Sequence, residues 1–105
     1  MGIILVVDDS ATVRQQVGTV LKNAGHTVTE ADNGATGLSA AKVKPFDLMI
    51  IDVNMPVMGG LEMIAEVRKI PQHAKTPVFV LTTESSGDVV QRGKSAGATA
   101  WIVKP

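Results

Sequence analysis

The 105-residue sequence contains no cysteine, which excludes disulfide bonds and metal sites built from thiolates. Aromatic residues are scarce, with one tryptophan, two phenylalanines and no tyrosine. Neither sign of charge dominates, because ten lysines and arginines balance ten aspartates and glutamates. Without a basic surplus the sequence indicates neither a nucleic-acid partner nor a membrane surface, and we expect neither.

Long hydrophobic runs are also missing, since none approaches the ~20 residues that a bilayer span needs. The start of the chain lacks the basic segment and the cleavage site of a signal peptide, so we expect a cytoplasmic protein. The length fits one compact domain over residues 1–105. With 45% hydrophobic and 19% charged residues, the composition favours a folded core over disorder.

Short apolar runs recur along the chain and alternate with helical patterns. The runs are IILVV (3–7), TVTE (27–30), DLMIID (47–52), PVFVL (77–81) and AWIV (100–103). Four of them have the near-continuous aliphatic character of strands buried on both faces, whereas TVTE alternates as an edge strand does. Strands that alternate with helices predict βαβ units and a parallel sheet with right-handed crossovers.

Four helical patterns lie between these runs. The first is expected between Ser10, a predicted N-cap, and Gly25, a predicted stop. The others are predicted over about 34–43, 59–69 and 86–96. The apolar face expected for the first helix consists of Val13, Val17, Val20, Leu21 and Ala24.

The end of the chain is unusual for such a fold, because the predicted strand ending in Lys104-Pro105 has no helix after it. Both faces of a parallel sheet need a cover. At roughly 25 cal/mol per Å² of apolar surface, leaving a helix-sized area open costs several kcal/mol. We therefore expect either that the chain is cut short or that another molecule covers this face, such as a second copy in a dimer or a domain swap.

Polar side chains stand where the predicted strands end. Asp8 and Asp9 follow the first strand, Asp52 ends the third, Thr82 follows the fourth and Lys104 follows the fifth. In an open parallel sheet, functional groups gather at the carboxyl ends of the strands. A strand order of 2-1-3-4-5 makes the first and third strands neighbours, so the three aspartates would share one pocket flanked by the threonine and the lysine.

Three carboxylates in one pocket call for a cation. Two unit charges about 4 Å apart repel by about 4 kcal/mol at an effective dielectric near 20, and protonation or a metal ion relieves this repulsion. Hard oxygen ligands select Mg²⁺ or Mn²⁺ over zinc, and Mg²⁺ commonly completes its shell with a phosphoryl oxygen. Taken singly, each aspartate could equally be a helix cap or a turn residue. Their combination predicts a metal site arranged for phosphate.

The stretch DVNMPVMGG (52–60) predicts a tight loop after the third strand. Pro56 restricts the residue before it to an extended conformation, and the two glycines permit a sharp entry into the next helix. We expect this loop to aim the backbone N–H groups near Val53 and Asn54 at the carboxylate of Asp52, where they could hold a phosphoryl group.

Four motifs together resemble a response-regulator receiver domain, and among its members the single-domain chemotaxis regulators most closely. They are VVDDS, DxxMPxMxG, LTT and VKP, in this order, within a match that runs from Ile3 to Pro105. The resemblance implies a flavodoxin-like three-layer sandwich around a five-stranded parallel sheet. It also implies transfer of a phosphoryl group from a histidine kinase to an aspartate, which makes the protein a signalling switch and not an enzyme with a separate substrate.

The resemblance assigns roles to individual acids. Asp52 matches the phosphoacceptor. Asp9 and Asp52 match direct Mg²⁺ ligands, together with the backbone carbonyl of Asn54, and Asp8 matches the acid that acts on the metal through water.

Three further residues match positions that act on the phosphoryl group or respond to it. Lys104 matches the lysine that contacts the phosphoryl group, Thr82 the switch hydroxyl, and Trp101 the aromatic switch position, which is Tyr or Phe in most of the family. Trp101 is larger than either, so an inward rotation of its ring would need more space. The resemblance further implies an output partner that binds the face formed by the fourth helix and the fifth strand.

Two other interpretations are open at this stage. A phosphatase of the haloacid dehalogenase type also uses an aspartate nucleophile and Mg²⁺, but its two acids stand two residues apart after the first strand, whereas Asp8 and Asp9 are adjacent. The second is a degenerate receiver that serves only as an interaction module. The sequence does not name the kinase, the output target or whether the domain acts alone.

Overall fold

The structure is a computed structural model that describes residues 2–82 and 87–103. Five parallel strands form a single sheet in the order β2-β1-β3-β4-β5, which confirms the predicted fold class and strand order. The strands are β1 (Ile3–Val7), β2 (Thr27–Ala31), β3 (Leu48–Asp52), β4 (Val78–Thr82) and β5 (Ala100–Val103).

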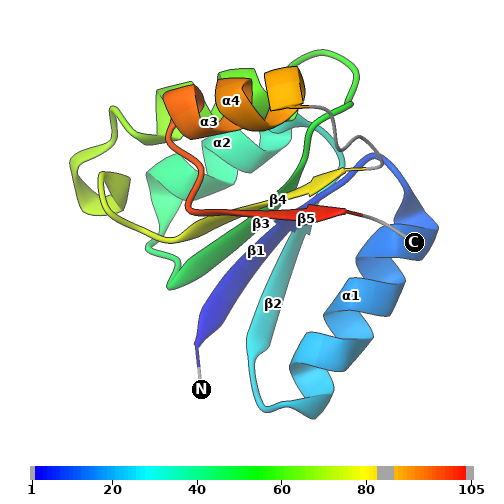
Figure 1. The fold of residues 1–105 in the computed structure, drawn as a ribbon. Coiled ribbons are helices and arrows are strands. Elements are labelled where there is room, and N and C mark those ends of the chain that lie inside the picture. The colour runs from blue at the N-terminus through cyan, green and yellow to red at the C-terminus, as the bar shows by residue number, and fades with distance from the viewer. Residues whose placement is uncertain (1, 83–86, 104–105) are drawn as a thin grey trace.

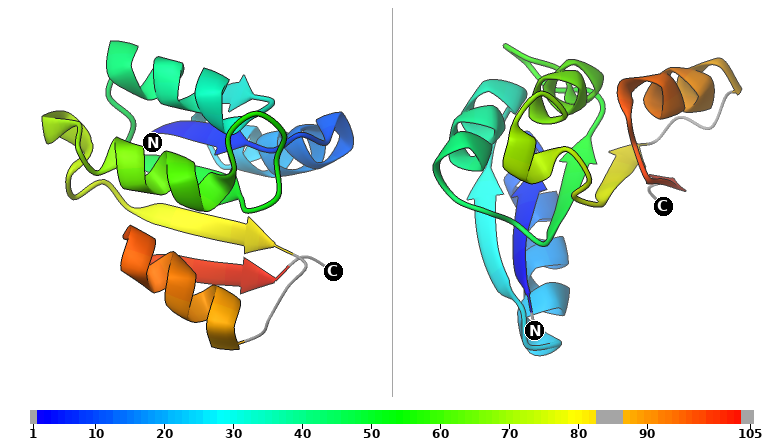
Figure 2. Two further views of the ribbon diagram at one scale, coloured as in Figure 1. Left: turned by 90° about the horizontal axis from the view of Figure 1, so that it is seen from above. Right: turned by 90° about the vertical axis from the view of Figure 1, so that its left-hand side faces the viewer.

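Helices cover both faces of the sheet, as Figure 1 shows. The helices are α1 (Ala11–Asn23), α2 (Gly34–Val43), α3 (Gly60–Val67) and α4 (Gly87–Ala96), with a short 3-10 turn over Pro71–His73. On one face lie α2, α3 and α4, and on the other lies α1, so the molecule has three layers (Figure 2). Since every strand points the same way, the carboxyl ends of β1, β3 and β4 lie at one edge of the sheet.

The predicted elements are confirmed with small shifts at their ends. The second helix and the fifth strand have the predicted bounds, and Ser10 caps α1, where its Oγ accepts a hydrogen bond from the N–H of Val13 at 3.3 Å. The third helix is shorter than the expected 59–69, and begins at Gly60 and ends at Val67.

The main core fills the space between the sheet and the three helices α2, α3 and α4. Its fully buried members include Leu5, Met49, Ile51, Met63 and Ile64. A smaller cluster on the opposite face joins Ile4, Val6 and Ile50 to half-buried residues of α1 and of the strands. The alternation along β1 therefore sends one set of side chains into each layer, as a parallel sheet requires.

The prediction for α1 is wrong at two positions. Val17 and Leu21 pack against the smaller cluster, whereas Val20 is 67% exposed and Ala24 is also exposed. A single helix touches a sheet along a narrow stripe, and among the described residues no second helix lies beside α1 to cover its flank. The apolar face of this helix is consequently narrower than its pattern of aliphatic residues indicates.

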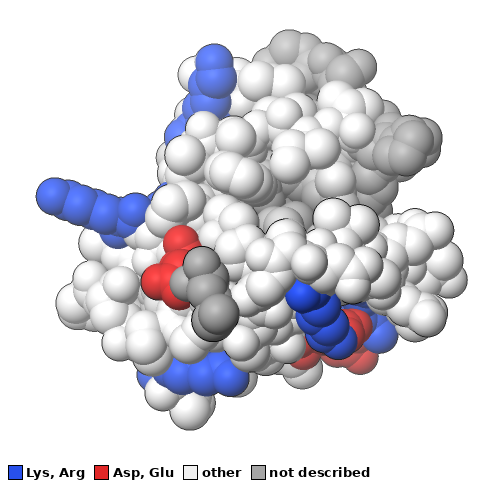
Figure 3. Space-filling view, turned by 90° about the horizontal axis from the view of Figure 1, so that it is seen from below, with Lys and Arg blue, Asp and Glu red and all other residues white. Residues whose placement is uncertain are grey.

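The sheet face beside α1 is only partly covered. Ile102 of β5 pairs with Leu81, which belongs to this face, and is 40% exposed. Viewed from below, the molecule shows a mostly uncharged surface with a few small charged groups, and in one of them acidic and basic side chains lie against each other (Figure 3). None of the helices in the described part of the chain combines the length and the hydropathy of a membrane span.

Candidate functional site

The loop between β1 and α1 holds Asp8 at the edge where the strands end. The backbone N–H of Asp8 donates to the carbonyl of Ala31 at 3.1 Å, which extends the pairing of β1 with β2 by one residue. Its carboxylate Oδ1 accepts a hydrogen bond from the N–H of Ser10 at 2.9 Å. Because Ser10 also caps α1, the turn that carries the paired acids is tied to the helix that follows.

The three predicted acids come together. Asp8, Asp9 and Asp52 each offer a carboxylate oxygen, and these oxygens lie within 4.8 Å of one another. Asp8 is fully buried and Asp52 is 5% exposed, while Asp9 is exposed. The set of hard oxygen donors, two buried and one open to solvent, fits a Mg²⁺ ion that keeps part of its water shell.

The loop after Asp52 is tightly turned, as predicted. The N–H of Met58 donates to the carbonyl of Pro56 at 2.7 Å, and Val57 between them has a φ of 69°, so the three residues form a γ-turn. At the end of the loop, the N–H of Gly60 donates to the carbonyl of Val53 at 3.0 Å. The loop thereby returns to the strand end and starts α3 beside the acid cluster.

Gly60 is needed for this return, because a Cβ atom there would lie 2.0 Å from the backbone carbonyl oxygen of Asp52. The expectation for the loop is wrong for the N–H of Val53, while that for the N–H of Asn54 stays a prediction. The N–H of Val53 donates to the carbonyl of Leu81 at 3.3 Å and so continues the ladder with β4 instead of facing the carboxylate of Asp52. Asn54 is exposed two residues beyond Asp52, and its part in the site stays a prediction.

Thr82 ends β4 and is fully buried. Leu81 pairs with Asp52, so the threonine stands one residue beyond the level of that acid on the neighbouring strand. The remaining predicted member of the site, Lys104, lies outside the described residues. Of the predicted site, the structure thus brings together the acids and places the threonine at the same edge of the sheet.

Trp101 is half-buried and packs against the main core from β5. It pairs with Val80, whose side chain lies on the face that α2, α3 and α4 cover. The indole lies directly on α4 at Gly93, where an added Cβ atom would be 2.1 Å from its Cζ3 atom. The glycine therefore provides the space that the large aromatic ring occupies under the helix.

Arg68 ties the C-terminal end of α4 to the end of α3. Its guanidinium donates to the carbonyl of Gly97 through Nε at 3.1 Å and through Nη2 at 2.7 Å. Its Nη1 donates to the carbonyls of His73 and Thr76 at 2.9 and 2.6 Å. Burial lowers the pKa of this guanidinium. The sequence does not single out Arg68, because an arginine near the end of a helix is mostly exposed to solvent.

Arg14 lies in the first turn of α1, and its side chain is 18% exposed. Its Nη1 donates to the backbone carbonyl of Asp8 at 2.6 Å, next to the acid cluster. Sequence reasoning missed this residue. A signal was present, because a cation is unfavourable in the first turn of a helix, where the macrodipole is positive.

Comparison with known proteins gives the class of the protein. The family model of the response regulator receiver domain matches residues 4–105, so the chain belongs to this family. Chemotaxis protein CheY of Pseudomonas aeruginosa is 36% identical over 103 residues, which are 97% of this chain and 83% of that protein. The solved structure of the chemotaxis response regulator CheY4 of Vibrio cholerae is 47% identical, with a TM-score of 0.96, and covers 100% of this chain and 88% of its own.

The same domain also occurs within much longer proteins. A gliding motility regulatory protein of Myxococcus xanthus is 35% identical over 101 residues, which are 96% of this chain but only 13% of that protein. Family and fold together define a phosphoaccepting receiver domain, a class of signalling switch.

Proposed function

We propose that Asp52 accepts the phosphoryl group, taken from a phosphohistidine of a histidine kinase, and that Asp8, Asp9 and Asn54 join it in holding Mg²⁺. The observation that carries the proposal is the meeting of three carboxylates from the ends of β1 and β3 within 4.8 Å. Such a cluster is unfavourable without a cation and suits a divalent ion with room for a phosphoryl oxygen.

In this reaction a carboxylate oxygen of Asp52 attacks the phosphorus atom of the donor. The P–N bond to the imidazole breaks, the imidazole takes up a proton, and an acyl phosphate forms on Asp52. The bound Mg²⁺ would supply positive charge against the phosphoryl oxygens. Because Asp52 is 5% exposed, the strand end and the loop that follows limit the access of water to the product.

Thr82 and Lys104 complete the proposal. The hydroxyl of Thr82, buried at the end of β4, would donate to a phosphoryl oxygen once the group is attached, and the ammonium of Lys104 would neutralise part of its charge. This contact exists only in the phosphorylated state, so it stabilises one of two arrangements of the protein around the site. Phosphorylation thereby shifts the equilibrium between the two arrangements. Trp101 beneath α4 would respond to that shift.

We further propose that residues 1–105 form one receiver domain whose output partner binds at α4 and β5, and that it acts in the cytoplasm. The likeness to CheY proteins supports a role in chemotaxis or in a related motility pathway. What covers the open part of the sheet beside α1 stays a prediction, and we propose a second copy of the chain, in a dimer or a domain swap. Light scattering would distinguish a monomer from a dimer.

The test of the function is incubation with Mg²⁺ and acetyl phosphate, followed by intact-mass measurement. We expect a transient species heavier by one phosphoryl group, and none with Asp52→Asn. Glu62→Gln, an exposed change on α3, is the matched control and should label normally. If Asp52→Asn labelled as the unchanged protein does, Asp52 would not be the acceptor.

A phosphatase of the haloacid dehalogenase type predicts a different result. Such an enzyme would release phosphate from small phosphate esters over many turnovers. A receiver takes its phosphoryl group from an activated donor and then hydrolyses the acyl phosphate slowly. Multiple turnover of a small phosphate ester, with no acetyl phosphate present, would therefore favour the phosphatase.

A further inference from the structure

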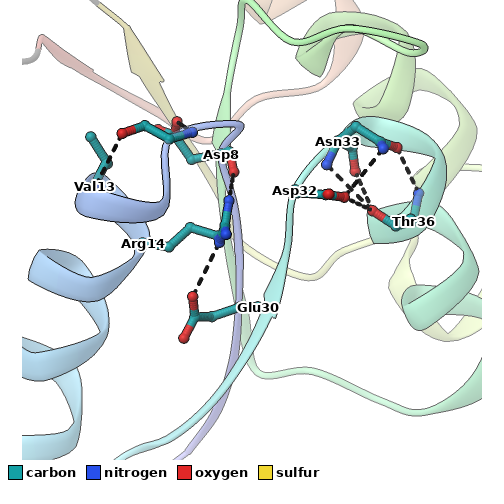
Figure 4. Close-up of polar contacts among 8 residues, drawn as sticks. Asp8, Val13, Arg14, Glu30, Asp32, Asn33 and Thr36 are labelled. Carbon is teal, nitrogen blue, oxygen red and sulfur yellow. Dashed lines mark hydrogen bonds and ion pairs between the residues drawn. The ribbon is translucent and has the colours of Figure 1, made fainter.

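The guanidinium of Arg14 donates to two acceptors that lie in different directions. Its Nη1 donates to the backbone carbonyl of Asp8 at 2.6 Å, and its Nε donates to Oε1 of Glu30 on β2 at 3.1 Å. Figure 4 shows the side chain reaching from the first turn of α1 between these two acceptors. It thus joins three elements, namely the loop after β1, the helix α1 and the strand β2.

The contact with Asp8 lies where the pairing of β1 with β2 stops. The N–H of Asp8 donates to Ala31, and its carbonyl receives the guanidinium of Arg14. That carbonyl belongs to the peptide unit between Asp8 and Asp9. A hydrogen bond to a charged donor is roughly twice as strong as one between neutral groups. The bond therefore restrains the rotation of the peptide that sets the two acids relative to each other.

The position of Arg14 in the first turn of α1 is electrostatically unfavourable for the helix. The first turn of α1 carries no acidic residue, and a cation there opposes the helix macrodipole by about 0.3–1 kcal/mol. The ion pair with Glu30 offsets part of this cost, although Glu30 is 40% exposed. A locally unfavourable residue that is held in place by two contacts is the kind of exception found near functional sites.

We propose that Arg14 is a positioning residue for the metal-binding loop: by bonding the Asp8 carbonyl it holds Asp8 and Asp9 in the arrangement that binds Mg²⁺, and Glu30 orients it. The inference depends on the proposed function, because it concerns the same metal site. Arg14 does not touch the phosphoryl group in this account and acts only through the peptide of Asp8.

The change in Mg²⁺ affinity on removal of Arg14 distinguishes a positioning role from a purely electrostatic one, because the two roles predict changes of opposite sign. If Arg14 acted only through its charge, removing it would strengthen Mg²⁺ binding, because a nearby positive charge opposes a cation. If Arg14 positions the loop, removing it weakens Mg²⁺ binding. Groups that orient metal ligands typically change metal affinity by 10- to 100-fold when they are removed, and we expect on the order of tenfold here.

The experiment titrates magnesium chloride into the metal-free protein by calorimetry, for the unchanged chain and for Arg14→Met. Weaker binding by Arg14→Met supports the proposal, and equal or tighter binding overturns it. Arg14→Lys can still donate one hydrogen bond and should recover part of the loss. An affinity for Arg14→Lys below that of Arg14→Met would contradict the proposal.

A second readout distinguishes positioning from a general loss of stability. The rate of labelling by acetyl phosphate is measured against Mg²⁺ concentration. We expect Arg14→Met to need about ten times more Mg²⁺ for half the maximal rate while the maximal rate changes little. Lys69→Met is the matched control, since it removes an exposed cation paired with Glu66 beyond the end of α3. A lower melting temperature with unchanged Mg²⁺ dependence would overturn the proposal.

If Arg14→Met does not fold, Arg14→Lys carries the test, because it keeps the positive charge but loses the planar geometry of the guanidinium. We expect a loss of Mg²⁺ affinity smaller than tenfold, whereas a role through charge alone predicts no change, and no loss would overturn the proposal. Measurements on the unchanged chain distinguish failure of the proposed function from failure of the role proposed for Arg14. If it neither bound Mg²⁺ nor labelled on Asp52, the proposed function would fail. If it did both and all variants matched it, only the role of Arg14 would fail.

Discussion

Replacing Asp52 with asparagine removes one of three carboxylates whose oxygens lie within 4.8 Å of one another. The change keeps the size of the side chain and its ability to accept hydrogen bonds. Two of the three acids, Asp8 and Asp52, are almost wholly buried, so solvent screens their mutual repulsion poorly. We therefore expect Asp52→Asn to make the metal-free protein more stable than the unchanged chain.

The separation sets the size of the effect. Two unit charges 4.8 Å apart repel by about 3.5 kcal/mol at an effective dielectric of 20 and by about 0.9 kcal/mol in water. Asp9 is exposed, so its repulsion with Asp52 is near the value in water. Asp8 is buried, so its repulsion with Asp52 is nearer the higher value. Because the unfolded chain largely lacks this repulsion, we expect Asp52→Asn to raise the free energy of unfolding by about 1–3 kcal/mol.

Urea denaturation in the presence of a chelator measures the increase in the free energy of unfolding. The same measurement with Mg²⁺ shows how the metal changes that increase. Mg²⁺ should stabilise the unchanged chain more than Asp52→Asn, so the difference between them should shrink or reverse. Glu62→Gln removes one negative charge from an exposed position in the first turn of α3, outside the cluster. It should leave stability unchanged or lower it by up to about 1 kcal/mol, because an acid there interacts favourably with the helix macrodipole. A metal-free Asp52→Asn protein that is less stable than the unchanged chain would refute this account of the cluster.

Three further substitutions test the geometry around the site. Gly60→Ala places a Cβ atom 2.0 Å from the carbonyl oxygen of Asp52, and we expect roughly 3 kcal/mol of lost stability in urea denaturation; a neutral effect would contradict the close approach. Val57→Asn should stabilise by about 1 kcal/mol in the same assay, because a β-branched residue is strained at a φ of 69° and this one is 83% exposed; a loss of stability would argue against strain. Gly93→Ala should displace the indole of Trp101 and shift its fluorescence, which is unambiguous because the chain has one tryptophan; an unchanged spectrum would show that the ring lies elsewhere.

Most of the fold could be predicted because it depends on patterns that are local in the sequence. Four near-continuous aliphatic runs bounded by turn residues identify buried parallel strands wherever they occur. The alternation of strands with helices then leaves few topologies, because crossovers are right-handed. The acid cluster followed from the same reasoning, since Asp8 and Asp52 end strands that this topology makes neighbours.

The contacts of long side chains could not be predicted in the same way. Arg14 and Arg68 look like ordinary helical cations in the sequence, but the structure directs both toward backbone carbonyls. A lysine or arginine stem can reach either solvent or a buried acceptor, and the choice depends on where distant carbonyls lie. The exposure of Val20 was missed for a related reason, because its burial depends on a neighbour for α1 and not on the period of the helix.

The sequence by itself determined the order of strands and helices and the supply of acids at the strand ends, because periodicity and turn residues act over a few neighbouring positions. Only the tertiary structure decided how closely those acids approach, that Gly93 makes room for Trp101, and that Arg14 bonds the peptide beside the acids. These features join residues that are close in space through packing, where separations of a few tenths of an ångström decide whether a contact forms.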